Sequence, residues 1–132
     1  MKMKKLSIFI LFMGFNLNAA AAQEGGMLND FDMPLLEGLS ENLEGAMLFD
    51  SPDGRIINAE ATGDIPGARI FAYYKVVLPS LGWKVTEDQL SGLTCEEGAI
   101  FCLNAMREKE VLNLSINEKY ESAKISFTLS PL

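Results

Sequence analysis

The two cysteines are the residues of this chain whose type and spacing point most directly to chemistry. Cys95 and Cys102 enclose a short loop that contains Glu96, Glu97 and Gly98. In an oxidising compartment the default for such a pair is a disulfide, which stabilises a loop of fewer than about ten residues by roughly 2 to 3 kcal/mol. A redox-active pair is the alternative, but the spacing is not C-x-x-C and no basic neighbour favours a thiolate. The sequence therefore predicts a structural disulfide.

Histidine is absent from the 132 residues of the chain. Catalytic arrangements of the Ser-His-Asp or Cys-His kind are therefore excluded, as is a histidine-based metal centre. Two thiols alone cannot complete a zinc shell. Asp50 and Asp53 flank a turn and suggest a calcium loop, but Ala61 stands where that loop requires a glutamate ligand. We expect no cofactor and no metal site.

Acidic side chains are the remaining candidates for catalysis. A pair of carboxylates could act as acid and base if burial kept one of them protonated. The acidic residues of this chain fall on predicted turns and on polar strand faces, where solvation is the simpler interpretation. A carboxylate-dependent hydrolase would need two acidic side chains that converge in one cleft within about 5 to 10 Å. We therefore keep it as an alternative and expect a protein that is not an enzyme.

The first 22 residues have the order of a secretory signal peptide. Three lysines precede an apolar run over residues 6–15, and small residues follow up to the predicted cleavage between Ala22 and Gln23. The run is shorter than the roughly 20 residues of a transmembrane helix, so we expect no stable membrane anchor after cleavage. An uncleaved anchor is the alternative. The pattern predicts a bacterial protein that is periplasmic or secreted.

The predicted exported form is strongly acidic. Removal of residues 1–22 takes away three lysines and leaves eight basic and 18 acidic residues, a net charge near −10. A surface of this charge repels the phosphate backbone of nucleic acids and anionic membrane surfaces. Neither is expected as a partner.

Residues 23–45 have the pattern of an arm that precedes a domain over residues 46–132. Neither helix nor strand periodicity persists in the arm, so we expect an irregular segment with a helical turn near residues 40–43. Its apolar content is higher than a solvated linker needs, so it packs on its own domain, which we favour, or docks on a partner. Tyr73, which a helical count leaves at the edge of the core, joins the candidates for an interface. The candidates in the arm are Met27, Leu28, Phe31, Leu35 and Leu36.

The domain begins with a predicted hairpin. Strand-like residues 46–50 and 55–61 flank Ser51-Pro52-Asp53-Gly54, where proline presets φ and glycine accepts a left-handed conformation. A change to helical spacing follows, with Asp64 as a candidate cap, and predicts a helix over residues 66–78.

Four further segments have the pattern of strands: residues 83–85, 100–106, 111–117 and 123–129. The last two alternate apolar and polar side chains, which is typical of an antiparallel sheet with one wet face. The predicted fold class is α+β, with one main helix packed on an antiparallel sheet of about five to six strands. The expected order is β-β-α-β-β-β for five strands. If the sheet has six strands, a fourth strand follows the helix.

Three segments of the chain resemble a set of small exported bacterial proteins of unassigned function. They are FDSPDGRI at residues 49–56, FAYY at 71–74 and LPSLGW at 78–83. The resemblance covers most of the predicted exported chain and implies a helix packed across a sheet. It implies no activity, cofactor or site residue, and the cysteine pair is not part of it.

Three functional hypotheses follow from the sequence. The first, which we favour, is a non-catalytic periplasmic module that binds a protein partner in the cell envelope or serves as an accessory subunit there. The second is a small-molecule carrier with an apolar pocket between helix and sheet, lined by Phe71, Tyr74, Trp83 and Phe127. The third is the carboxylate-dependent hydrolase.

Overall fold

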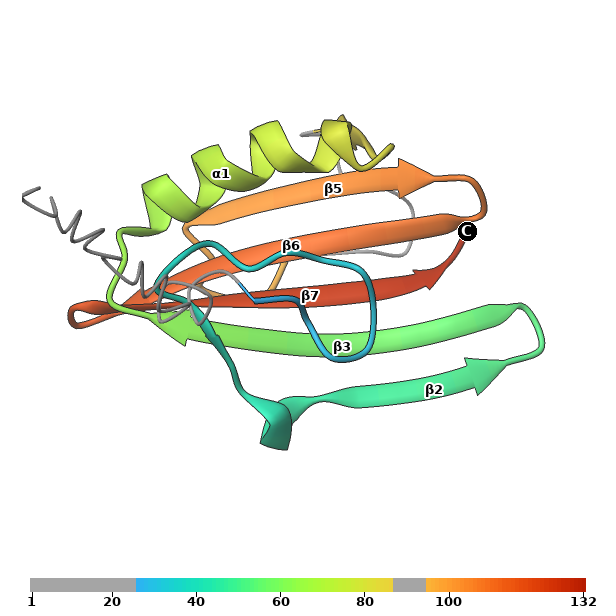
Figure 1. Cartoon of the computed structure of the whole chain (residues 1–132), viewed down its shortest axis with the longest axis horizontal. Coiled ribbons are helices and arrows are strands. Elements are labelled where there is room, and N and C mark those ends of the chain that lie inside the picture. The colour runs from blue at the N-terminus through green and yellow to red at the C-terminus, as the bar shows by residue number, and fades with distance from the viewer. Residues whose placement is uncertain (1–25, 87–94) are drawn as a thin grey trace, which may run out of the picture.

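A computed structural model describes residues 26–86 and 95–132 of the chain (Figure 1). The predicted signal peptide and its cleavage site between Ala22 and Gln23 lie outside the described residues. The described part contains seven strands, one α-helix and one 3-10 turn. All paired strands are antiparallel, and the α+β class is confirmed.

The sheet follows the order β1-β3-β7-β6-β5-β4, and β2 pairs with β3 at the same edge as β1. The seven strands exceed the predicted five to six because residues of the arm form β1. The strands are β1 (Ser40–Glu41), β2 (Met47–Ser51), β3 (Gly54–Gly63), β4 (Lys84–Thr86), β5 (Phe101–Arg107), β6 (Glu110–Lys119) and β7 (Ser122–Pro131).

The β2–β3 hairpin forms where the sequence predicts it. Ser51 pairs with Gly54 across the turn residues Pro52 and Asp53. Gly54 has a φ of 141°, a conformation that side chains disfavour, and its carbonyl accepts a hydrogen bond of 2.6 Å from the Ser51 hydroxyl. The turn is therefore specified by its own residues.

Helix α1 (Gly67–Ser80) packs one face on the sheet, with Ile70, Tyr74 and Leu78 buried beneath it. The helix starts one residue later and ends two residues later than predicted. Asp64 is not its cap. Instead, Glu118 of β6 accepts a hydrogen bond of 2.5 Å from the N–H of Gly67, because the sheet brings its carboxylate to the helix N-terminus.

The arm packs into the core of the same domain. Leu28, Phe31 and Met33 are buried in the cluster that also holds the α1 stripe. Phe31 contacts Phe127 of β7 edge-on at 6.3 Å between ring centroids, and the Tyr74 hydroxyl donates a hydrogen bond of 2.8 Å to the Pro34 carbonyl. The arm and α1 therefore cover the same face of the sheet.

The predicted helical turn near residues 40–43 is wrong in its position. Ser40–Glu41 forms β1, which pairs with Thr62 and Ala61 of β3. The turn itself, η2, follows at Leu43–Gly45, and the side chain of Asn42 accepts a hydrogen bond of 3.2 Å from Glu44 N–H. Asn42 therefore caps the turn and separates it from the strand.

The two faces of the sheet differ as the alternation in β6 and β7 predicts. Leu112, Leu114 and Ile116 of β6 point to the core, as do the side chains of Ile125 and Phe127 of β7. The alternate residues carry amides, hydroxyls and charges on the other face. We call this second face the polar face.

Candidate protein-binding site

Strand β2 is an edge strand whose apolar side chains are left uncovered. Within the described residues it pairs only with β3, and it lies at the margin of the sheet (Figure 1). Met47, Leu48 and Phe49 are 49%, 53% and 57% exposed. Large apolar side chains are common singly on a surface, but three in a row on an edge strand form a contiguous patch. We call these three residues the β2 patch.

The backbone of β2 has hydrogen-bonding capacity on its free side. In an antiparallel pair alternate residues direct their N–H and C=O toward the partner strand, so the residues between them direct these groups away from β3. The side chains of the β2 patch occupy both faces, because Leu48 is in register with Ile57, while Met47 and Phe49 are in register with Asn58 and Ile56. An added strand would meet apolar contacts above and below the sheet as well as backbone partners.

In the part of the chain that the structure describes, the opposite edge of the sheet has no such patch. Strand β4 has only three residues, its Lys84 is exposed, and α1 contacts it. Short length, an exposed lysine and a covering helix are common ways to prevent unwanted strand pairing. The contrast identifies β2 as the edge that is open to a partner strand.

Charge near the β2 patch is mainly negative. Asp50 directly follows the β2 patch, Asp53 lies in the turn, and Glu44 lies in the preceding η2. Arg55 is in register with Asp50, but its guanidinium binds Glu110 through two hydrogen bonds of 3.0 and 3.3 Å. This hydrogen-bonded carboxylate raises the pKa of Arg55. The Arg55 charge is thus shared with Glu110, and the edge attracts basic groups.

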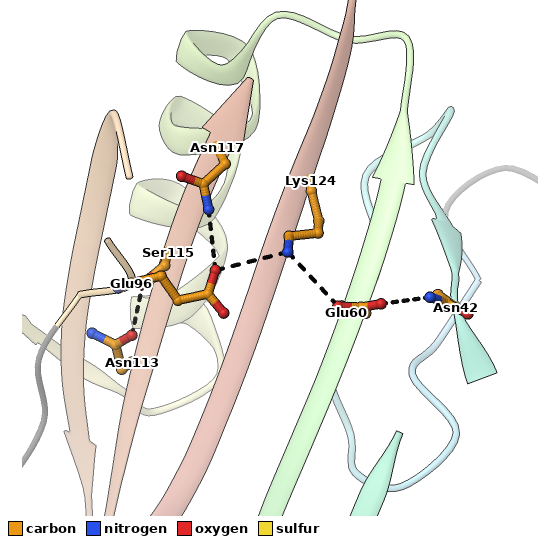
Figure 2. Close-up of polar contacts among 7 residues, drawn as sticks. All are labelled: Asn42, Glu60, Glu96, Asn113, Ser115, Asn117 and Lys124. Atoms are coloured by element: carbon orange, nitrogen blue, oxygen red, sulfur yellow. Dashed lines mark hydrogen bonds and ion pairs between the residues drawn. The ribbon is translucent and has the colours of Figure 1, made fainter. Parts of the chain in front are cut away.

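The polar face carries a second cluster, in which two glutamates lie on either side of Lys124 (Figure 2). Lys124 Nζ is 4.0 Å from Glu60 Oε2 and 3.9 Å from Glu96 Oε2. Asn42 donates to Glu60 Oε1 at 2.5 Å, and Asn117 donates to Glu96 Oε2 at 3.1 Å. Both glutamates line a hollow of about 300 Å³.

The two glutamates converge on one lysine, since each has an oxygen within 4.0 Å of Lys124 Nζ, but their surroundings do not suit acid catalysis. Their side chains are 26% and 45% exposed. A general acid at neutral pH needs burial that favours its protonated form, as well as a free proton to donate. Here a lysine lies between the carboxylates. The arrangement is that of a surface ion-pair cluster.

A disulfide links Cys95 and Cys102, with 5.9 Å between their Cα atoms, as the sequence predicts. It holds Glu96 against the sheet, where the Glu96 N–H donates a hydrogen bond of 3.0 Å to the Ser115 hydroxyl. Asn113 Oδ1 accepts a hydrogen bond of 3.0 Å from that hydroxyl (Figure 2). The Asn113 amide also donates to the Cys102 sulfur at 3.4 Å. The disulfide and these polar contacts thus fix one loop on the polar face.

Three of the predicted interface residues lie inside the domain rather than on its surface. Leu28, Phe31 and Leu35 are buried in their own domain, because the arm fills the part of the sheet that α1 leaves uncovered. They offer no surface to a partner. Leu36 is partly buried against the same core, while Met27 is exposed.

Tyr73 is also partly buried against its own domain rather than exposed to solvent. Its ring meets that of Tyr74 edge-on at 4.9 Å, and it is half-buried against the core. Burial raises the pKa of Tyr73, and it raises that of the fully buried Tyr74 much further. Both hydroxyls therefore favour the neutral form.

The space between helix and sheet, where a ligand pocket was a hypothesis, is occupied by the protein itself. Tyr74, Trp83 and Phe127 are almost completely buried. The Tyr74 and Phe127 rings meet at 5.5 Å, and Phe71 stacks on Phe101 at 4.8 Å. Tyr74 and Phe127 therefore pack on one another, and Phe71 packs on Phe101.

The β2 patch was not among the interface candidates of the sequence analysis. Its signal is nevertheless present in the sequence, because three consecutive large apolar residues give a strand two apolar faces. Such a strand is either central in a sheet or covered on both sides, unless it is a binding edge. In the structure β2 pairs with β3 and, among residues 26–86 and 95–132, with no second strand, so it is not central. The exposure of its side chains shows that no described element covers it, which the sequence alone does not show.

Within residues 26–86 and 95–132 no group of three histidine, cysteine, aspartate or glutamate side chains could hold a metal ion. The helix found in these ranges is too short and not apolar enough to cross a membrane. Comparison with known protein families, with curated protein sequences and with solved structures finds no match to this chain.

Proposed function

We propose that this protein works in the periplasm as a non-catalytic protein-binding module of the cell envelope. Its docking element is β2, which takes up an extended segment of the partner as an additional strand. The observation that carries this proposal is the exposure of the β2 patch on an unpaired sheet edge. The disulfide supports the location, because such bonds persist in oxidising compartments.

The partner segment has a defined chemistry. It is extended, so that its backbone can continue the ladder, and apolar at successive positions that meet Leu48 on one face and Met47 and Phe49 on the other. It carries lysine or arginine beside the apolar residues, because the edge is flanked by Asp50 and Asp53. An acidic or proline-containing segment does not meet these requirements.

Synthetic peptides of this chemistry test the proposal directly. We would titrate the 15N-labelled protein, with its disulfide oxidised, with the peptide Lys-Val-Ile-Val-Ile-Val-Lys, which is apolar on both faces. Two analogues serve as comparisons, one with prolines in place of the isoleucines and one with glutamates in place of the lysines. We expect amide shifts concentrated on residues 47–51 with the basic peptide, and at least about tenfold weaker binding of both analogues.

A pair of protein variants controls for surface charge. Leu48→Asp places a charge in the β2 patch, whereas Val76→Asp places one on the exposed face of α1. The first should abolish binding of the basic peptide and the second should leave it unchanged. Equal binding by both variants, or shifts spread over the whole surface, would show that β2 is not the docking element.

A further inference from the structure

The β2 patch is complementary to itself. If two copies of β2 run antiparallel about a two-fold axis through Leu48, that residue faces its own copy. Met47 then faces Phe49 of the second copy, and Asp50 faces Ala46. All three residues of the β2 patch would thus meet apolar partners, and the two Asp50 carboxylates would stay apart.

The side chains of the two faces fit this register. Met47 and Phe49 lie on the same face of β2, so the pairing creates two methionine–aromatic contacts there. Leu48 lies on the other face and meets its copy. A register centred on Phe49 instead places Asp50 opposite Leu48, which would desolvate a carboxylate against an apolar side chain. The register centred on Leu48 is therefore favoured.

Charge and contact area make such an association weak. The full chain has a net charge of −7, and the predicted exported form one near −10, so two copies repel one another. Salt screens this repulsion. Pairing of a five-residue strand also covers less surface than a stable interface of about 1,200 to 2,000 Å². A partner strand with basic residues meets attraction where a second copy meets repulsion.

We propose that, without its partner, the protein covers β2 by pairing it with β2 of a second copy, in the two-fold register centred on Leu48. This inference rests on the proposed function in that both assign β2 as an open docking edge. The homodimer is a resting state, which increasing salt strengthens. The basic partner segment displaces the second copy, and salt weakens its binding.

Disulfide trapping tests the register. Directly opposed residues in an antiparallel pair have Cα atoms about 4.5 to 5.5 Å apart, which is within the range for a disulfide. Leu48→Cys should therefore form a covalent dimer on mild oxidation, at least about tenfold faster than Met47→Cys, whose own copy is displaced along the strand. Val76→Cys on α1 controls for random collision. The native disulfide is verified by mass spectrometry in each variant.

Two further conditions separate this inference from the proposed function. Raising sodium chloride from about 20 to about 300 mM should speed the Leu48→Cys reaction, and the basic peptide should slow it. Equal rates for all three cysteine variants would overturn the resting dimer, while peptide shifts on β2 would still support the proposed function. Fast, register-specific trapping without peptide binding would support the dimer and count against the proposed function.

Discussion

Replacement of Tyr74 by phenylalanine tests how firmly the arm is joined to the helix. The Tyr74 ring is fully buried and touches Phe127, so phenylalanine keeps the packing. Only the hydroxyl is lost, together with its hydrogen bond of 2.8 Å to the Pro34 carbonyl in the arm. A partly buried carbonyl that loses its donor costs about 1 to 2 kcal/mol. We expect Tyr74→Phe to lower the free energy of unfolding by that amount at pH 7.

The same substitution should behave differently in alkaline solution. Burial raises the pKa of Tyr74 far above its ordinary value, and the neighbouring Tyr73 acts in the same direction. The native protein therefore keeps the proton, while the unfolded chain loses it above about pH 10. Because the unfolded state then binds fewer protons, the contribution of this group to stability is complete below pH 10 and decreases as pH rises.

The size of the pH effect follows from the unfolded-state titration. At pH 11, one unit above the ordinary tyrosine pKa, ionisation favours the unfolded wild-type chain by about 1.4 kcal/mol, which Tyr74→Phe avoids. The deficit of the variant should therefore shrink from about 1 to 2 kcal/mol at pH 7 to less than about 1 kcal/mol at pH 11.

Urea unfolding followed by the fluorescence of Trp83 measures both values. Tyr120→Phe is the matched control, because Tyr120 is 94% exposed and its hydroxyl is in water in both states. It should leave stability unchanged at pH 7. An unchanged stability of Tyr74→Phe at pH 7 would refute the arm contact. A deficit that stays constant from pH 7 to pH 11 would refute the linkage reasoning.

Three further changes test other parts of the structure by urea unfolding. Reduction of the Cys95–Cys102 disulfide should lower stability by about 2 to 3 kcal/mol through the entropy of the opened loop. Gly63→Ala should cost about 1 to 3 kcal/mol, because its Cβ would meet the Gly38 carbonyl oxygen where β3 approaches the arm. Tyr120→Gly should raise stability by about 0.5 to 1 kcal/mol, because Tyr120 has a φ of 60° that glycine adopts without strain.

Each of these changes has an internal control. Gly26→Ala meets nothing within 4 Å and should be neutral, so an equal loss at Gly26 and Gly63 would contradict the close-approach interpretation. Tyr120→Phe keeps the backbone conformation and should show no gain, in contrast to Tyr120→Gly. A reduced protein as stable as the oxidised one would show that the loop is held by its polar contacts instead.

Local signals in the sequence account for much of the fold. Pro52, Asp53 and Gly54 specify the hairpin turn because their backbone preferences act within four residues. The stripe of Ile70, Tyr74 and Leu78 identifies the helix and its buried face in the same way, since both depend only on spacing along the chain. The spacing of the two cysteines and the composition of the chain were likewise sufficient to predict the disulfide.

Features that depend on distant residues could not be predicted. The helix cap comes from Glu118, which is 51 residues away from Gly67, and so the nearby Asp64 was the wrong choice. The arm has no periodicity, yet Phe31 reaches Phe127 and Pro34 reaches Tyr74. Whether an irregular apolar segment packs on its own domain or on a partner depends on the space that the sheet and helix leave uncovered.

The sequence by itself determined the α+β class, the turn, the helix stripe and the alternation of the last two strands, because each is a short-range pattern. Only the tertiary structure decided which apolar residues stay in water. It buried Leu28, Phe31 and Leu35 and left Met47, Leu48 and Phe49 exposed. The physical reason is that hydrophobicity drives burial without choosing a partner, so the remaining uncovered edge is defined by the packing of all the other elements.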